Sequence, residues 1–271
     1  MTNSRVPITV VIPTLNEGAR LGAALESVRW ADDVIVVDGG SADDTVGIAD
    51  RSGARTMVVP GRTIGAQRNA GLEVAKHEWV LALDADESVT PELQESLRRL
   101  SEGSVERHAS FRVRSRNWHL GRELRHGPWG NDWKIRVLSR GERFTESRVH
   151  ENLVSQSDVG TISGELIHHP YEDLAHQVVK IAKYAQWAAL DMQDRGRTAS
   201  IWAMLTHPAV RFVRDYLVLG GWRDGVAGFI VSTTSAFSVF CKYASFLVAQ
   251  RTVVSEQRYA AVSRLRSSAR Y

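Results

Sequence analysis

The chain has 271 residues, of which 43% are hydrophobic and 24% charged, a balance typical of a globular protein with one large domain or one domain and an extension. This composition argues against extensive disorder, and the small net charge of +3 gives no reason to expect a nucleic-acid partner. A single cysteine, Cys241, excludes an intrachain disulfide and a cysteine-rich zinc site.

The two ends of the chain contain sequence features that predict where in the cell the protein acts. The segment Met1–Pro7 is short and polar and lacks the apolar run of a signal peptide, which predicts a cytoplasmic protein. After Arg251 the tail carries one acid, Glu256, against four further arginines: Arg258, Arg264, Arg266 and Arg270. A basic tail suits an anionic membrane surface, as in a peripheral protein, or is simply a solvated terminus.

The first hundred residues alternate strand and helix patterns. Strand patterns predict four strands at 8–12, 34–37, 55–59 and 79–83, of which 8–12 and 34–37 are short apolar runs expected of buried strands. Helical patterns follow each strand: one capped by Asn16, one from Ser41 to about Arg51, one over 64–76, and one opened by Thr90 and Pro91. Alternation with short connections predicts an α/β fold, Rossmann-like, with a mostly parallel sheet and flanking helices.

In such a sheet, ligands bind beyond the carboxyl ends of the strands. Three segments should meet there: 13–17, 38–41 and 84–87. From about Phe111 the pattern changes to further strands near 135–138 and 161–168, and from Tyr171 onward it is helical. We therefore expect a ligand-binding α/β domain over 1–170 and a helical extension over 171–271.

The extension contains an uncharged run over 225–241. A membrane span needs about 20 predominantly apolar residues, so this run falls just short. Aromatic residues around it, including Trp222 and Phe229, fit a helix that lies on a membrane surface. A helical subdomain packed on the sheet explains the same pattern equally well.

The strongest chemical signal is the pair Asp84 and Asp86 at the end of the fourth predicted strand. Acids at i and i+2 leave a strand on the same face, and their mutual repulsion costs free energy that a divalent cation removes. Mg²⁺ or Mn²⁺ would suit these oxygen ligands and could bridge them to substrate phosphates. An Asp-x-Asp pair also arises by chance in solvated loops, so its position after a buried strand is what gives it weight.

Other polar residues follow the strands in the same way. Asp38 can accept hydrogen bonds from a base or ribose, and the turn that begins at Pro13 lies where a helix N-terminus presents free N–H groups. Arg68 could contact a phosphate. Simple helix capping at the two turns, and a surface arginine at Arg68, are the alternatives.

These segments together resemble the family 2 glycosyltransferases of the GT-A fold, closest to the bacterial lipopolysaccharide-core β-glucosyltransferase type. The matching pieces, in order, are VVIPTLNE, VIVVDGGSADDT, GAQRNAGL and LALDADE, followed by WGNDWKIRVLSR and RVHENL. They cover about the first 170 residues. Gly39-Gly40 and Lys134 depart from the commoner residues, and Lys134 puts acceptor contacts in doubt.

The resemblance implies roles for particular residues. A nucleotide would lie against the strand ends, with Asp84 facing its ribose or phosphate and Asp86 holding the metal. The base of an inverting transfer would be Asp132, with Glu151 as the second candidate. The nucleotide pocket would be lined by Pro13, Thr14, Glu17, Asp38 and Arg68.

The resemblance further implies a metal-dependent hexosyltransferase that moves a sugar from a nucleotide diphosphate, usually UDP, to a glycan or lipid-linked acceptor of the cell envelope. Five arginines could bind a phosphorylated acceptor or form a solvated basic face: Arg112, Arg114, Arg116, Arg122 and Arg125. A nucleotidyltransferase is the enzymatic alternative, although the first turn lacks a glycine cluster. A catalytically silent, membrane-attached sugar-nucleotide-binding module is the non-enzymatic one.

Overall fold

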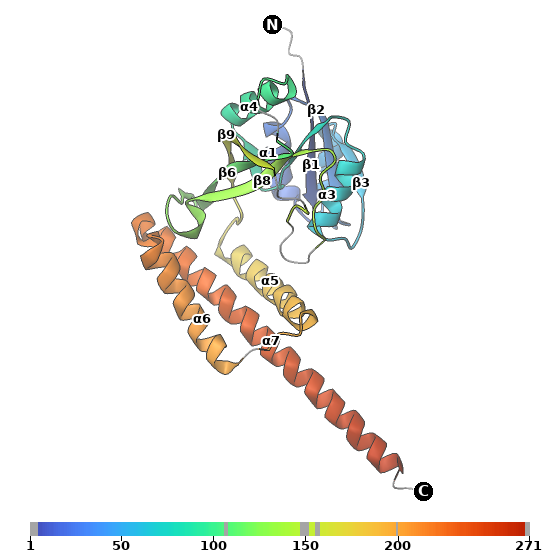
Figure 1. Ribbon diagram of the computed structural model, residues 1–271, viewed down its shortest axis with the longest axis vertical. Helices are drawn as coiled ribbons and strands as arrows, with labels where there is room; N and C mark the ends of the chain where they lie inside the picture. The colour runs from blue at the N-terminus through green and yellow to red at the C-terminus, as the bar shows by residue number, and fades with distance from the viewer. Residues whose placement is uncertain (1–4, 106–107, 147–151, 155–157, 199, 269–271) are drawn as a thin grey trace. The chain divides into compact units, whose positions relative to one another are not determined.

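A computed structural model describes the chain except residues 1–4, 106–107, 147–151, 155–157, 199 and 269–271, and it describes side chains only to residue 250 (Figure 1). Glu151 and the basic tail side chains beyond residue 250 therefore lie outside the described part. Contacts divide the chain into two compact units, Met1–Tyr171 and Glu172–Tyr271.

The first unit is built on one mixed sheet. Its strands are β1 (Val6–Thr14), β2 (Ala31–Asp38), β3 (Arg55–Val58), β4 (Trp79–Ala82), β5 (Glu87–Val89), β6 (Ser110–His119), β7 (Arg122–Glu123), β8 (Asp132–Ser139) and β9 (Val159–His168). The order across the sheet is β3-β2-β1-β4-β8-β6-β9-β5, and β7 pairs with β6. The predicted α/β class is confirmed, and the four early strands fall where the strand patterns predict them.

All strand pairs in the first half of the sheet are parallel, whereas the second half is mixed. Strands β3, β2, β1 and β4 run parallel, whereas β8 is antiparallel to both β4 and β6, and β5 is antiparallel to β9. Only β6 and β9 form a later parallel pair. Parallel neighbours need a crossover, usually a helix, and helices alternate with strands only in the first half of this unit.

Four helices flank the sheet: α1 (Gly18–Ser27), α2 (Thr45–Arg51), α3 (Ile64–Glu73) and α4 (Pro91–Ser101). One buried cluster joins Ile8, Val10 and Ile12 of β1 to side chains of α1, α2 and α4. A second cluster joins Val11 of β1 to Leu72 of α3. Because side chains alternate along a strand, β1 contributes to the core on both faces of the sheet.

The helix starts differ in part from the sequence expectation. Thr90 caps α4 as expected, because its hydroxyl accepts a hydrogen bond from the Leu93 N–H at 3.4 Å. Asn16 and Ser41 do not cap helices, since α1 begins at Gly18 and α2 at Thr45. Instead Asn16 adopts a left-handed conformation (φ 58°), which asparagine tolerates better than most residues. The polar residues at these strand ends therefore organise loops.

The second unit consists of α5 (Leu174–Asp194), α6 (Ile201–Val213) and α7 (Gly225–Ser268), with a π-helical turn at Arg214–Val218 and a 3-10 turn at Gly221–Asp224. Both α5 and α6 pack against α7. Among the described residues, one helical stretch, Gly221–Gln250, has the length and composition to cross a membrane. This stretch is longer than the uncharged run expected from the sequence, because the helix continues through Lys242.

Close packing of α3 on β1 generates a stability prediction. A Cβ on Gly71 would lie 2.3 Å from Val11 Cγ1, so Gly71→Ala should lower the free energy of unfolding by about 1–3 kcal/mol through overpacking. A Cβ on Gly22 of α1 would meet no atom within 4 Å, so Gly22→Ala should be neutral or stabilising. Urea unfolding of both variants checks this, and equal effects would contradict the packing argument.

Candidate functional site

The loops after β1 and β2 are tied together by Asp38, which is fully buried. The Thr14 hydroxyl donates to Asp38 Oδ1 at 3.1 Å, and the N–H groups of Gly40 and Ser41 donate to Asp38 Oδ2 at 2.8 Å each. The Asn16 N–H in turn donates to Ser41 Oγ at 2.7 Å. Asp38 thus shapes the turn at this edge of the sheet through both of its oxygens.

Helix α3 brings its run of small and polar residues against the same edge. A Cβ on Gly39 would lie 2.4 Å from Nε2 at the end of the Gln67 side chain, so α3 packs closely on this turn and a larger residue would displace that amide. The Asn69 side chain exchanges two hydrogen bonds with the backbone of Phe144, at 2.9 and 2.8 Å. These contacts fix α3 so that Arg68, which is buried, points to the end of β4.

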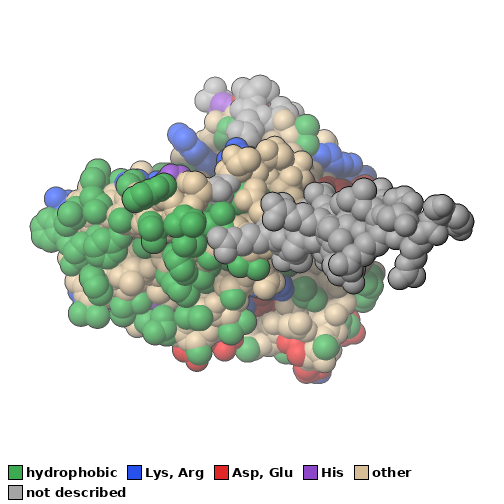
Figure 2. Space-filling view, turned by 90° about the horizontal axis from the view of Figure 1, so that it is seen from below, with side chains coloured by type: hydrophobic (Ala, Val, Ile, Leu, Met, Phe, Trp, Pro, Cys, Tyr) green, Lys and Arg blue, Asp and Glu red, His purple; other side chains and the backbone are tan. Residues whose placement is uncertain are grey.

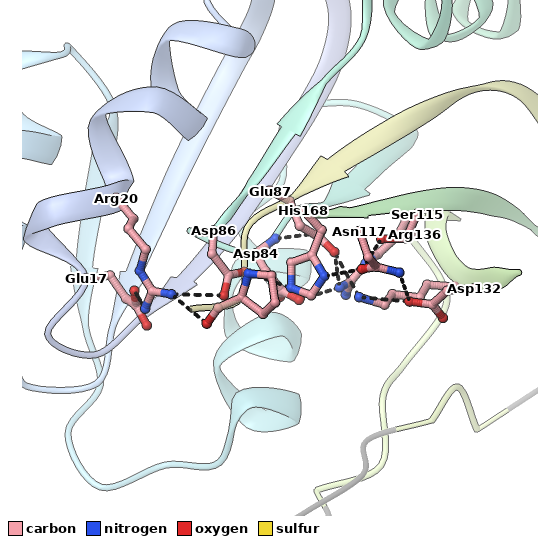
Figure 3. Close-up of polar contacts among 12 residues, drawn as sticks. Glu17, Arg20, Asp84, Asp86, Glu87, Ser115, Asn117, Asp132, Arg136 and His168 are labelled. Atoms are coloured by element: carbon pink, nitrogen blue, oxygen red, sulfur yellow. Dashed lines mark hydrogen bonds and ion pairs between the residues drawn. The ribbon is translucent and has the colours of Figure 1, made fainter. Parts of the chain in front are cut away.

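Asp84, which is partly buried, lies at the centre of a network of charges whose other main members are buried. Its carboxylate pairs with Arg68 at 2.5 Å through one oxygen and with Arg136 of β8 through the other. Arg136 also binds Glu87 Oε1 at 2.9 Å, and Lys134 reaches the same oxygen at 3.2 Å (Figure 3). The network has acids and cations interleaved, which is what burial of several charges requires.

The charges of this network set its protonation. Burial alone would raise the pKa of Asp84, but Arg136 and Arg68 outweigh it and hold that pKa well below its usual range. Burial also acts to raise the pKa of Glu87, but the nearby positive charges, chiefly Arg136 and Lys134, together outweigh it and lower that pKa. The pKa of Arg136 is raised because attraction to the two carboxylates outweighs its own burial. Both acids are therefore ionised at neutral pH.

Asp86 faces a different set of partners. Its Oδ2 accepts from Arg20 of α1 at 3.2 Å, and Arg20 also pairs with Glu17. Its Oδ1 lies 3.6 Å from His168 Nε2 at the end of β9 (Figure 3). Pairing of β5 with β9 causes this approach, because Glu87 and His168 are partners in that register.

An amide, Asn117 of β6, connects His168 to Asp132. His168 Nδ1 lies 2.6 Å from Asn117 Oδ1, and Asn117 Nδ2 donates to Asp132 Oδ2 at 3.3 Å and to the Trp129 carbonyl at 2.8 Å. Since an amide oxygen can only accept, His168 carries its proton on Nδ1 and turns the lone pair of Nε2 toward Asp86. Burial lowers the pKa of His168, which favours this neutral form.

Aromatic side chains line the region beside Asp86. The rings of His119, Trp129 and Tyr171 form a cluster with centroids 5.9 to 6.1 Å apart. Burial raises the pKa of Tyr171, and the charge of Asp86 raises it further. A surface of this kind offers flat apolar faces next to polar groups, which suits a sugar ring.

The structure brings most of the predicted residues to one edge of the sheet. Thr14 and Asp38 meet there directly, Arg68 reaches Asp84, and Glu17 meets Asp86 through Arg20. Pro13 is a buried residue of β1, opposite Val37. Asp132 begins β8 and joins the network through Asn117 and Lys134. Of the predicted basic face, Arg114 and Arg116 both pair with Glu165.

Sequence reasoning missed five residues of this site: Arg20, Glu87, Asn117, Arg136 and His168. Glu87 carried a usable signal, because it directly follows the acidic pair at the end of a buried strand. Arg20 lies on α1, and no local pattern indicates that it meets Asp86. The other three lie on β6, β8 and β9, and their neighbours depend on the order of these strands in the sheet.

The donor atoms determine which residues fit a divalent cation. Among the described side chains, no group of three or more His, Cys, Asp or Glu is arranged to hold a metal ion. Asp84 fits poorly, because Arg68 and Arg136 engage both its oxygens. Asp86 and His168 fit better, since they present an oxygen and a nitrogen to nearly the same point, and Mn²⁺ accepts both.

Comparison of the amino-acid sequence with known proteins relates the chain to one family of enzymes. The family model for glycosyl transferase family 2 matches residues 9–152. The chain is 30% identical over 244 residues to the lipopolysaccharide core biosynthesis glycosyltransferase LpsC of Rhizobium meliloti, covering 87% of this chain and 90% of that protein. It is 26% identical over 259 residues to an uncharacterized glycosyltransferase of Rickettsia felis, covering 88% of each.

Solved structures also resemble it. One of them, glucosyl-3-phosphoglycerate synthase from Mycobacterium tuberculosis in complex with phosphoglyceric acid, is 21% identical with a TM-score of 0.48. The match covers 72% of this chain and 81% of that one.

The buried network predicts a large effect of removing Arg136. Arg136→Met leaves Asp84 and Glu87 buried without their main counter-charge, so the free energy of unfolding should fall by about 3–5 kcal/mol. Arg99→Met, which removes an exposed partner of Glu95, should leave stability nearly unchanged. Urea denaturation at pH 7 compares the two variants.

The pH dependence of the same variants provides a check. Asp84 and Glu87 have lowered pKa values in the folded state, so their contribution is present above their unfolded pKa values of about 4 and is lost as pH falls. The loss of stability on acidification should be steeper in wild type than in Arg136→Met. Equal stability of Arg136→Met and Arg99→Met would contradict the role given to the network.

Proposed function

Because the chain belongs to glycosyl transferase family 2 and has the GT-A fold, we propose that it is an inverting, metal-dependent hexosyltransferase that uses a UDP-linked sugar. The observation that carries the proposal is the meeting of Asp86, His168, Asn117 and Asp132 at the carboxyl edge of the sheet. These residues connect a candidate metal ligand to a candidate base across one site.

The donor would occupy the edge formed by β1, β2 and β4. Thr14, Asp38 and Arg68 lie there, and the backbone of this edge is held by the Asp38 hydrogen bonds. Pro13 and Glu17 border the same turn. UDP is the nucleotide that the family resemblance favours, and its uracil and ribose would lie against these loops.

The diphosphate would extend toward Asp86. Asp86 and His168 would hold Mg²⁺ or Mn²⁺, with Asp84 outside the coordination shell because its ion pairs orient it toward Arg68 and Arg136. A divalent cation held there would stabilise the negative charge of the departing UDP. Arg20, already beside Asp86, would add a positive charge at the same place.

Asp132 would accept the proton of the acceptor hydroxyl as that hydroxyl attacks the anomeric carbon. The Asn117 amide orients one carboxylate oxygen of Asp132, and Lys134 lies 3.7 Å from the same oxygen. A base needs a fixed orientation to work in a single in-line displacement. Glu151, the second candidate, lies outside the described residues.

The acceptor would be a glycan or a lipid-linked glycan. Its sugar ring would lie on the rings of Trp129 and Tyr171. The similarity to a lipopolysaccharide core glycosyltransferase supports a role in lipopolysaccharide or another envelope polysaccharide, on the cytoplasmic side of the membrane. We place the donor and acceptor sites in the domain over 1–170 and assign membrane attachment to the extension over 171–271.

Two alternatives differ in observable ways. A nucleotidyltransferase would release pyrophosphate from a nucleoside triphosphate, and family membership argues against it. A silent binding module would bind a sugar nucleotide without turnover. Release of UDP from a panel of UDP-sugars with Mn²⁺ and a lipid-extract acceptor separates the three functions, and no release from any donor would favour the silent module.

The assignment of the metal ligand predicts the behaviour of Asp86→Asn. Removal of one carboxylate charge should weaken the effect of Mn²⁺ on UDP binding, because the cation then loses its anionic protein ligand. Isothermal titration with UDP, GDP and ADP, each with and without Mn²⁺, measures this and identifies the nucleotide. If Mn²⁺ enhances UDP binding equally in wild type and Asp86→Asn, the metal site lies elsewhere.

The assignment of the base predicts the behaviour of Asp132→Asn. Loss of the proton acceptor should lower kcat by about 10²–10⁴-fold while the Kd for UDP with Mn²⁺ changes little. Asp44→Asn is the matched control, since Asp44 is an exposed acid of the same unit that pairs with Arg51, and it should retain full turnover. Full turnover by Asp132→Asn would transfer the role of base to Glu151.

A further inference from the structure

Helix α6 exposes the face that a globular helix normally buries. Ile201, Leu205, Val213 and Leu217 recur at multiples of four residues, and all four side chains are about half exposed. Trp202 and Val210 beside them are 75% and 65% exposed. An apolar stripe at this spacing ordinarily faces a core, so here it lacks the partner that its pattern predicts.

The opposite side of α6 already has its partner within the second unit. Phe212 packs edge-to-face on Phe229 of α7 at 5.8 Å, and His207 Nδ1 lies 2.7 Å from the Tyr243 hydroxyl. The exposed stripe therefore points away from the α6–α7 contact. It continues in the π-helical turn at Val218 and beyond that turn at Trp222 and at Val226, the second residue of α7; these side chains are 74%, 52% and 74% exposed.

Hydrophobic side chains are crowded together on the face seen in Figure 2. We name as the apolar face of α6 the exposed hydrophobic residues of α6, of the turns that follow it and of the start of α7: Ile201, Trp202, Leu205, Val210, Val213, Leu217, Val218, Leu219, Trp222 and Val226.

The charges around this face are mainly basic, although Arg195 pairs with Asp191 and both Arg211 and Arg214 pair with the buried Asp215. Residues 195–250 include two acids, Asp215 and Asp224, and both are buried. The basic residues of the same stretch are Arg195, Arg197, Arg211, Arg214, Arg223 and Lys242. An apolar surface with tryptophans and a basic border is complementary to a bilayer with anionic headgroups, where the rings reach the acyl boundary and the arginines meet phosphates.

We propose that the apolar face of α6 lies in the interface of an anionic membrane and holds the enzyme at a lipid-anchored acceptor. This deepens the proposed function by assigning membrane contact to one surface, although binding to lipid needs neither donor nor metal. The occupant is a lipid surface, because exposed tryptophans beside an excess of basic side chains match the boundary between acyl chains and anionic headgroups.

The arrangement favours lying on the membrane over crossing it with α7. Helix α7 packs against α5 along with α6, and Gln177 of α5 donates to Thr234 of α7 at 2.9 Å. Helix α5 carries Lys180, Lys183 and Asp191, whose burial in hydrocarbon would be costly. An α7 that spans the bilayer would have to separate from α5 or bring these charges with it.

Vesicle binding of the full chain tests the proposal. Wild type should co-sediment with vesicles of phosphatidylcholine and phosphatidylglycerol more than with phosphatidylcholine alone, without UDP or Mn²⁺. Val210→Glu and Val218→Glu should each lower the partition coefficient by about tenfold, because a carboxylate enters the interface poorly. Val154→Glu, at a 69% exposed valine of the first unit, should bind as wild type does.

Two further measurements keep the test decisive. Thermal melting should show that all three variants fold, because the substituted valines are exposed. Sedimentation velocity identifies a second copy of the chain as an occupant: a wild-type dimer that Val210→Glu dissociates, with no vesicle binding, would overturn the proposal. Equal vesicle binding by Val210→Glu, Val218→Glu and wild type would also overturn it. Turnover on a soluble acceptor reports separately on the proposed function.

Discussion

The site depends on the pairing of Asp84 with two arginines from different parts of the chain. Arg68 arrives on α3 and Arg136 on β8, and both reach the one carboxylate that ends β4. Glu87 extends the pairing to β5 and fixes the backbone of the acidic turn by accepting the Asp84 N–H at 3.1 Å. Once Asp84 is held in this way, the turn directs Asp86 toward Arg20 and His168.

The two acids of the Asp-x-Asp pair therefore have different partners and different chemical roles. Asp84 is neutralised by protein cations and stabilises the turn, whereas Asp86 meets a neutral imidazole and the guanidinium of Arg20. The buried amide of Asn117 contacts both His168 and Asp132. One side chain therefore orients a candidate metal ligand and the candidate base. Buried polar networks of this kind hold only when each member is satisfied.

The helical unit differs from the first unit because it exposes a large apolar surface. Its α7 packs against α5 and α6, while the far side of α6 stays apolar and exposed. In water such a surface is a cost, and on a lipid surface it is a source of binding. An enzyme with a lipid-linked acceptor would gain from confinement to the surface that carries the acceptor.

The sequence by itself determined the α/β class, the four early strands and the family, because each rests on local patterns: apolar runs, their spacing and ordered motifs. It also indicated Asp38, Asp84, Asp86 and Asp132 by their places after strands or within motifs. Tertiary structure alone decided that Asp84 is bound by Arg136 and that His168 meets Asp86. Those contacts arise from strand order and register between segments more than 50 residues apart, which no local pattern encodes.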